Sequence, residues 1–193
     1  APEEMTAFEV VGEQDLGARL RVVVSVFHYD IDNLITLVTD PADDLLVYEN
    51  ADEVRSSGLE LGLDARMRRG VRGRASYSYQ KTDDPQTGER LSNSPAHLAK
   101  LNLVVPMLEY RASAAVQLQY MSTRETITGG ETADHVTADL TLLWRNRAQW
   151  LTLSAAFYNL FDTAYGDPGS EEHVQALIPR DGRTYHLKAQ FNW

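Results

Sequence analysis

Cysteine is absent from the sequence, which excludes disulfide bonds and thiolate metal sites. No run of apolar residues approaches the length of about 18 that a transmembrane helix requires. The opening segment, APEEMTAFEV, is acidic and has no basic stretch followed by an apolar one, so it does not form a secretory signal. With 193 residues, of which 43% are hydrophobic, the chain is long enough for one domain with a sizeable core.

Basic residues are outnumbered, 18 against 28 acidic residues, and the formal net charge is −10. Nucleic-acid-binding proteins usually present a basic face, so we expect no nucleic-acid partner. The acidic residues gather in TDPADD, KTDDPQTGE, GGETADH and YGDPGSEEH, whereas the basic residues gather in RMRRGVRGR and WRNRAQW. One interpretation is that these segments are ordinary solvated loops. The other is that two ends of one object differ in charge.

Apolar and polar residues alternate along much of the chain, which is typical of β-strands. In GLELGLDARM, Leu59, Leu61 and Leu63 fall on one side, and Glu60 and Asp64 fall on the other. The same alternation appears in VRGRASYSYQ, YRASAAVQLQY, HVTADLTLLWR, WLTLSAAFYN and TYHLKAQFNW. The segment RLRVVVSVFHYD is too uniformly apolar for its faces to be assigned. Since no helical period competes, the sequence predicts an all-β fold.

The connections between these segments alternate in length. Short ones fall near residues 12–18, 69–73, 106–111 and 145–149, and long polar ones fall near 30–55, 81–94, 122–135 and 162–183. Short turns at one end and long loops at the other are typical of an antiparallel up-and-down meander. We expect about nine strands, near 5–14, 18–37, 46–68, 71–83, 95–106, 109–123, 135–146, 149–162 and 182–193.

Two architectures fit such a meander. A soluble sandwich or lipocalin-like barrel buries its apolar face, whereas a transmembrane β-barrel turns that face to lipid and lines a wet lumen with polar residues. The polar faces carry charged residues along whole strands, and several strands reach the length of about 9–11 residues needed for a tilted membrane crossing. Aromatic residues near the ends of the apolar faces suit interfacial belts: Tyr79, Tyr110, Tyr120, Trp144, Trp150, Phe157, Phe191 and Trp193. These features predict a transmembrane β-barrel surrounded by lipid.

Catalytic and nucleotide-binding motifs are missing: the sequence has no G-x-S-x-G, Walker, G-x-G-x-x-G or H-E-x-x-H segment. The histidines show no metal-ligand spacing and are expected in the lumen or in loops: His28, His97, His135, His173 and His186. The segments DPADD and GDPGSEE offer oxygen ligands for calcium, but neither matches a known loop pattern, so solvated turns are expected. We predict no catalytic residue, no metal site and no cofactor.

Charged residues on the polar sides of two neighbouring strands form a candidate charge ladder: Glu60, Asp64, Arg66, Arg72 and Arg74. Cross-strand pairing inside a wet lumen is its expected role, and guidance of a ligand is a second interpretation. A different class of function, an enzyme in the barrel wall, requires a histidine within hydrogen-bond reach of Ser113 or Ser154, and the sequence gives no sign of one.

The last third of the sequence contains YNLFDTAYGDP (158–168) and IPRDGRTYHLKAQFNW (178–193), an Asn-Leu-Phe-Asp segment followed by a loop and a Gly-Arg-led final strand. The segments FHYDIDNLI, YENADEVRSSGLELGL and LSNSPAHLAKLNL carry the same likeness. Together these motifs resemble the C-terminal end of TonB-dependent outer-membrane receptors. That family usually ends in Phe, whereas this chain ends in Trp193 and so keeps an aromatic residue.

The resemblance implies a receptor of the bacterial outer membrane that imports a scarce, bulky ligand such as a ferric siderophore, haem or cobalamin. The four long loops, near 30–55, 81–94, 122–135 and 162–183, would form part of its vestibule. Such receptors are plugged 22-stranded barrels. An odd count of about nine strands therefore predicts that residues 1–193 are a single domain, the C-terminal part of a barrel without its plug. An inner-membrane energy transducer would be a partner only through the missing N-terminal part.

The final alternating strand resembles the signal that the barrel-insertion machinery reads in outer-membrane barrels. By that resemblance its apolar contacts are Tyr185, Leu187, Phe191 and Trp193. An alternative drops the first strand and leaves a complete eight-stranded barrel with a structural or adhesive role. Pairing of residues 5–14 as a strand would distinguish the two.

Overall fold

The computed structural model describes residues 1–43, 45–109 and 111–192, and it is built almost entirely from β-strands. The strands are β1 (Glu4–Leu16), β2 (Leu20–Thr39), β3 (Leu46–Arg66), β4 (Arg72–Asp83), β5 (His97–Met107), β6 (Ala112–Met121), β7 (His135–Arg145), β8 (Leu151–Tyr158), β9 (Gly166–Pro168), β10 (Leu177–Pro179) and β11 (Thr184–Phe191). A short 3-10 turn, η1 (Arg68–Gly70), joins β3 to β4. Within these described residues no helix is long and apolar enough to cross a membrane.

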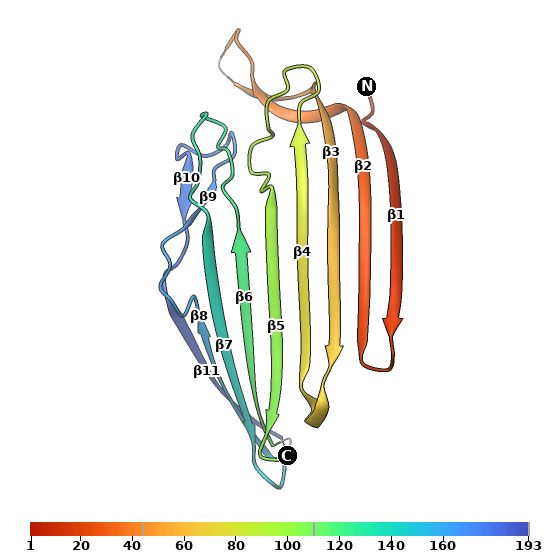
Figure 1. The fold of residues 1–193 in the computed structure, drawn as a ribbon. Helices are drawn as coiled ribbons and strands as arrows, with labels where there is room; N and C mark the ends of the chain where they lie inside the picture. The colour runs from red at the N-terminus through yellow and green to blue at the C-terminus, as the bar shows by residue number, and fades with distance from the viewer. Residues whose placement is uncertain (44, 110, 193) are drawn as a thin grey trace.

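Nine of the strands form one antiparallel sheet in the order β1-β2-β3-β4-β5-β6-β7-β8-β11 (Figure 1). The predicted nine-stranded meander is confirmed, and β1 pairs with β2 along its whole length, from Glu4↔Asp32 to Leu16↔Leu20. The alternative of a complete eight-stranded barrel is therefore wrong, because the first strand is an integral part of the sheet. In the described sheet, β1 and β11 each have one neighbour, so the sheet does not close on itself.

The connections differ in length between the two ends of the sheet (Figure 1). Short turns lie at one end of the sheet, called here the turn end, and join β1 to β2, β3 to β4, β5 to β6 and β7 to β8. The connections from β2 to β3, β4 to β5, β6 to β7 and β8 to β11 lie at the other end, called here the loop end. The expected loop near 30–55 is mostly strand, because β2 and β3 continue as a projecting hairpin beyond a register shift at Ile31–Ile35.

The strands of the sheet turn most of their apolar residues to the same side, called here the apolar face. The pairings Val22↔Leu63, Leu63↔Ala75, Ala75↔Leu101, Leu101↔Leu118 and Leu118↔Ala138 make one continuous apolar row across six strands. No second layer covers this row among the described residues, since Leu63 and Leu101 are each 43% exposed. The leucines therefore do not pack centrally, as they would in a soluble sandwich.

The opposite side, called here the polar face, is equally continuous. The pairings Arg21↔Asp64, Asp64↔Arg74, Arg74↔Asn102, Asn102↔Gln117 and Gln117↔Asp139 make a polar row across the same six strands. The strand register also shows which face each residue of the uniformly apolar segment of β2 belongs to. Val24 and Val26 pair with Leu61 and Leu59 on the apolar face, which leaves Ser25 on the polar face opposite Glu60.

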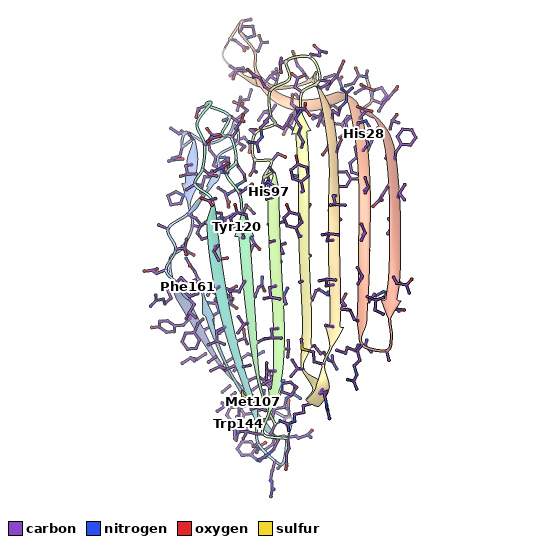
Figure 2. The ribbon with its side chains drawn as sticks, in the orientation of Figure 1. His28, His97, Met107, Tyr120, Trp144 and Phe161 are labelled. Carbon is purple, nitrogen blue, oxygen red and sulfur yellow. The ribbon has the colours of Figure 1, made fainter. Side chains whose placement is uncertain are left out.

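Aromatic side chains lie at both ends of the apolar face (Figure 2). Tyr79 and Tyr120 occupy the loop end of β4 and β6, and Trp144 occupies the turn end of β7. Trp150 stacks on Phe191 with ring centroids 6.0 Å apart, also at the turn end. This distribution is the one expected of interfacial belts. Tyr110 and Trp193 lie outside the described residues.

One exception to the polar composition of the polar face is Phe27, which is buried over Gly58 of the neighbouring strand. A Cβ atom at position 58 would lie 2.5 Å from Cζ of the Phe27 ring and would also overlap the carbonyl oxygen of Tyr79. Only glycine accommodates this packing, because the ring occupies the space of a side chain.

We expect Gly58→Ala to lower the free energy of unfolding by about 1–3 kcal/mol through overpacking. Gly62→Ala, four residues further along the same strand and on the same face, is the matched control, because its Cβ would make an ordinary 3.6 Å contact with Val23. Denaturant unfolding of both variants in detergent micelles measures the difference. Equal effects of the two substitutions would contradict the packing described for Phe27.

Candidate functional site

Three of the four long connections are joined to one another at the loop end. Asn93, in the β4–β5 loop, donates its backbone N–H to the carbonyl of Glu125 in the β6–β7 loop at 2.9 Å. Arg124, beside it, reaches both the β4–β5 loop and β9 in the last connection. The loops therefore form one assembly, called here the loop cluster.

Arg124 is the centre of the loop cluster and is only 5% exposed. Its Nη1 donates to Oδ1 of Asn93 at 2.9 Å, and its Nη2 donates to the carbonyl oxygen of Gly166 at 3.0 Å and to Oδ1 of Asp167 at 2.8 Å. Its backbone is held as well, because it exchanges hydrogen bonds with Thr132 across the same loop. A guanidinium suits this role, since its planar donors reach several acceptors from one fixed position.

Asp167 is held between two arginines, because Arg180 of the same long connection donates to its second oxygen, Oδ2. Partial burial on its own would raise the pKa of Asp167, but the hydrogen bonds from Arg124 and Arg180 outweigh it, so the pKa lies below the usual value of 3.8. Asp167 in turn raises the pKa of Arg180, first through their hydrogen bond and then through charge attraction. Both groups are therefore charged at neutral pH.

The lowered pKa of Asp167 predicts an acid-sensitive loop cluster. A carboxylate whose pKa is depressed by folding stabilises the fold above its ordinary pKa, and this stabilisation is lost as the pH falls through the depressed value. We expect the loops to remain protected at pH 5 and to open only below the usual value of 3.8. Hydrogen exchange of residues 122–134 and 166–169 as a function of pH measures this opening, and Asp167→Asn should abolish the acid transition.

A cavity of about 510 Å³ lies on the polar face beneath the loop cluster. Strand residues and loop residues line it together: Gln117, Gln119, Met121, His135, Thr137, Asp139, Tyr158, Asn159, Tyr165, Asp167, Arg180, Asp181, Gly182 and Thr184. Its walls combine amide, hydroxyl and charged groups with aromatic rings. A cavity with this lining suits a polar ligand that also presents a flat or apolar surface.

The side chain of His135 lines this cavity and is largely buried. It begins β7, is 7% exposed, and stacks on Tyr165 with ring centroids 4.5 Å apart. Its Nδ1 is buried and has no hydrogen-bond partner among the described residues. A buried polar atom without a partner costs free energy unless a ligand or water supplies one, so His135 is a candidate ligand contact.

The two halves of the Asn-Leu-Phe-Asp and Gly-Arg motif meet at the edge of this cavity. Asn159 is buried and accepts the N–H of Thr163 at 2.9 Å, and its own N–H reaches Asp139 at 2.9 Å. Asp162 accepts the backbone N–H of Arg183 at 2.8 Å. A Cβ on Gly182 would lie 2.7 Å from Oδ1 of Asp162, so only glycine permits this contact. The motif therefore fixes where the last connection leaves β8 and enters β11.

The candidate site differs in detail from what the sequence predicted. The four predicted loop regions do share one end, but Arg124, His135 and Tyr165 carried no local signal that would have singled them out. The predicted insertion-signal residues Tyr185 and Leu187 are 71% and 76% exposed on the apolar face of β11. Phe191 is also exposed, and Trp193 lies outside the described residues.

The histidines are spread over both faces, so the expectation that all lie in the lumen or in loops is only partly right. His28 and His97 lie near the loop end of the sheet, at positions whose register places them on the apolar face (Figure 2). Nδ1 of His97 shares a hydrogen bond of 2.8 Å with the hydroxyl of Tyr77. His173 bonds Ser170 within its own loop, and His186 packs edge-on against Tyr158 on the polar face. Across the described residues no group of three His, Asp or Glu side chains is arranged to hold a metal ion.

The remaining candidate sites from the sequence are the DPADD segment, the two serines and the charge ladder, and each makes local structural contacts. Asp40 and Asp43 of the DPADD segment accept backbone N–H groups of Ala42 and Leu45. Ser113 and Ser154 face Leu143 from either side, and Ser154 also faces Lys188, so their cross-strand neighbours include no histidine. Within the candidate charge ladder, Asp64 and Arg74 form an ion pair at 2.7 Å.

The two ends of the sheet differ in charge, as one interpretation of the sequence predicted. The connections at the loop end carry most of their charge as carboxylates: Asp40, Asp43, Asp84, Glu89, Glu125, Glu131, Asp134, Asp162, Asp167, Glu171, Glu172 and Asp181. The turn end carries arginines: Arg19, Arg21, Arg66, Arg68, Arg69, Arg72, Arg74, Arg111, Arg145 and Arg147.

Comparisons with known proteins agree with this architecture. The ferric-catecholate import receptor Fiu from E. coli K12 has a TM-score of 0.76 and 23% identity, covering 99% of this chain and 28% of its own. The ferric yersiniabactin uptake receptor FyuA from Yersinia pestis has a TM-score of 0.80 and 15% identity, and the match covers 99% of this chain and 30% of FyuA. The copper transporter OprC has a TM-score of 0.78 and 20% identity, and the match covers 100% of this chain and 32% of OprC.

The chain thus spans between 28% and 32% of the length of these three structures, and at such identities the likeness shows the fold. No curated protein matches the chain. The family model described as TonB dependent receptor-like, beta-barrel matches residues 1–160. Because that match covers most of the chain, the chain belongs to the TonB-dependent receptor β-barrel family, and its place is the bacterial outer membrane.

Proposed function

We propose that this chain forms part of the barrel wall and ligand vestibule of a receptor that imports a scarce, bulky ligand of the ferric siderophore, haem or cobalamin class. The family match over residues 1–160 carries this proposal. It is supported by the cavity beneath the loop cluster, whose lining combines polar groups with the stacked rings of His135 and Tyr165. The role is non-catalytic.

The ligands of the similar receptors favour an iron chelate without excluding other cargo. Two are import receptors for ferric catecholates and ferric yersiniabactin, and a third transports copper. The ligand of this chain is therefore best sought among ferric siderophores first, with haem, cobalamin and copper as further candidates.

We further propose that the nine strands are the C-terminal part of a larger barrel that carries a plug. An open strand edge in lipid leaves backbone N–H and C=O groups without partners, which the bilayer does not tolerate. β1 and β11 each need one more neighbour, and further strands of the same wall would supply it. On this proposal the apolar face contacts outer-membrane lipid, β11 is read by the barrel-insertion machinery, and an inner-membrane energy transducer acts through the plug.

The test uses the intact receptor that contains these residues, produced in a strain without its own siderophore receptors. Growth and uptake are measured with a panel of ferric siderophores, haem, cobalamin and copper. We expect energy-dependent uptake of at least one of them. Tyr165→Ala should weaken binding of that ligand about tenfold, as loss of an aromatic contact at the centre of a binding site does. His173→Ala, in the same connection but bonded only to Ser170, is the control. Uptake of nothing in the panel above background would count against the proposal.

A further inference from the structure

Three arginines occupy one rung at the turn end of the polar face. Arg66 ends β3 and lies directly opposite Arg72, which begins β4. On the other side of Arg66, its N–H donates to the carbonyl oxygen of Arg19 at 2.8 Å. Arg19 of the β1–β2 turn, Arg66 of β3 and Arg72 of β4 therefore lie in one row, and they are called here the arginine rung.

The arginine rung differs from the rung next to it, in which charges alternate. There Arg21 lies opposite Asp64, and Asp64 forms an ion pair with Arg74 at 2.7 Å. Arg21 in addition pairs with Glu13 of β1. Among residues 1–43, 45–109 and 111–192, none of the three arginines in the rung forms an ion pair, and all three are exposed.

Directly opposed like charges destabilise a sheet, so the rung is unfavourable in the wall alone. The short turn from Met67 to Val71 fixes the register, which sets Arg66 against Arg72. An anionic occupant would turn this unfavourable row into a binding site, because each guanidinium binds a carboxylate through two parallel N–H donors.

Space for such an occupant exists at the same place. A hollow of about 730 Å³ is lined by all three arginines of the rung and by Arg21 and Arg74. Asp15 and Asp64 are the only acidic side chains lining it in the described part of the chain. The hollow therefore has an excess of positive charge that these two carboxylates do not neutralise.

The register shows which surroundings the hollow faces. Arg66 and Arg72 share the polar face with Asp64 and Arg74, whereas the neighbouring Ala65 and Gly73 belong to the apolar face. On the proposed function the polar face lines the lumen, so a lipid headgroup outside the barrel does not reach the rung. A polypeptide inside the lumen does, and carboxylates are the anions that a polypeptide supplies.

We propose that the arginine rung binds an acidic polypeptide segment inside the barrel lumen, near the turn end, which is the periplasmic mouth because short turns lie on the periplasmic side of outer-membrane barrels. The inference rests on the proposed function, because it needs the polar face to line a lumen that holds another part of the receptor. It adds to that function a fixed anchoring point on the β1–β2 turn, β3 and β4, far from the ligand cavity at the loop end.

The experiment places a photoreactive residue beside the rung in the intact receptor in outer membranes. Val104 pairs with Arg72 and lines the hollow, so Val104→p-benzoylphenylalanine leaves every arginine in place. We expect it to cross-link to a peptide rich in Asp and Glu, identified by mass spectrometry. Leu103→p-benzoylphenylalanine, on the apolar face one residue earlier, is the control and should capture lipid but no peptide.

Charge removal then tests whether the arginines cause the contact. We expect R66Q/R72Q to lower the Val104 cross-link yield about tenfold, since charge-assisted hydrogen bonds are lost. R68Q/R69Q removes the same charge from η1, outside the hollow, and should leave the yield unchanged. R66Q/R72Q removes two like charges that lie opposite each other, so it should not impair folding. Heat-modifiable gel mobility should therefore show a folded barrel for R66Q/R72Q and for R68Q/R69Q.

Each outcome decides the matter. A cross-link to phospholipid, to a peptide without acidic residues, or to nothing overturns the inference, as does an equal loss of yield in both double variants. If the cross-link fails while ligand uptake is normal, the rung proposal fails and the proposed function stands. If the wild-type receptor takes up no ligand but the acidic cross-link forms, the proposed function fails and the lumen contact stands.

Discussion

Replacing Arg124 by alanine is expected to separate the loops of the loop cluster from one another. The substitution removes three side-chain hydrogen bonds that join the β4–β5 loop to β9, and it leaves a void where a buried guanidinium stood. Asp167 keeps Arg180 as a partner, so we expect a loss of about 2–3 kcal/mol in local stability rather than the larger cost of an unpaired buried charge. Exchange of the Thr132 and Gly169 amides should then quicken by a factor of about 30 or more.

The matched control is Arg90→Ala, in the same cluster. Arg90 is partly exposed and its guanidinium lies 4.0 Å from the Glu125 carboxylate, so its removal should change loop stability by no more than about 0.5 kcal/mol. Arg124→Lys keeps the positive charge but not the fork of donors, and it should give an intermediate effect. If Arg90→Ala accelerated exchange as much as Arg124→Ala, the role assigned to Arg124 would be wrong.

Placing an arginine on the apolar face is expected to be the most damaging change in the strands themselves. Val116 lies midway along β6 between Leu103 and Leu140, on the apolar face. A charge at mid-depth on the lipid side of a barrel costs about 2–4 kcal/mol. Val116→Arg should therefore reduce the amount of folded barrel in lipid vesicles and shift its urea midpoint downward.

The next residue provides the control with the same new side chain. Gln117 faces the other way, between Asn102 and Asp139, where an arginine gains a carboxylate neighbour. Gln117→Arg should fold as well as the parent protein. An equal loss of folding for both variants, or a greater loss for Gln117→Arg, would mean that the apolar face does not contact lipid.

The register explains why strands and faces were predictable while the site was not. Alternation with a period of two is a local property, so it placed Leu61 and Glu60 on opposite sides without knowledge of their neighbours. The valines of β2 have no such contrast, and only pairing with Leu59 and Leu61 assigns them. The β9–β10 hairpin has strands of three residues each, too short for any periodic signal.

The site residues depend on contacts between segments far apart in the chain. Arg124 stands in a polar loop like any other solvated arginine, and its burial follows from Asn93 and Asp167, 31 and 43 residues away. Likewise, the sequence suggested cross-strand pairing within the charge ladder but not its partners, and the turn between Arg66 and Arg72 sets these two arginines opposite each other.

The sequence by itself determined the all-β meander, the opposite character of its two faces and the opposite charge of its two ends, because alternation, loop length and loop charge are properties of short local segments. Only the tertiary structure decided which loops bind one another, where the cavity with His135 and Tyr165 lies, and which arginines remain without partners. Those features depend on strand register and on loop contacts across the sheet, which no local segment of the chain encodes.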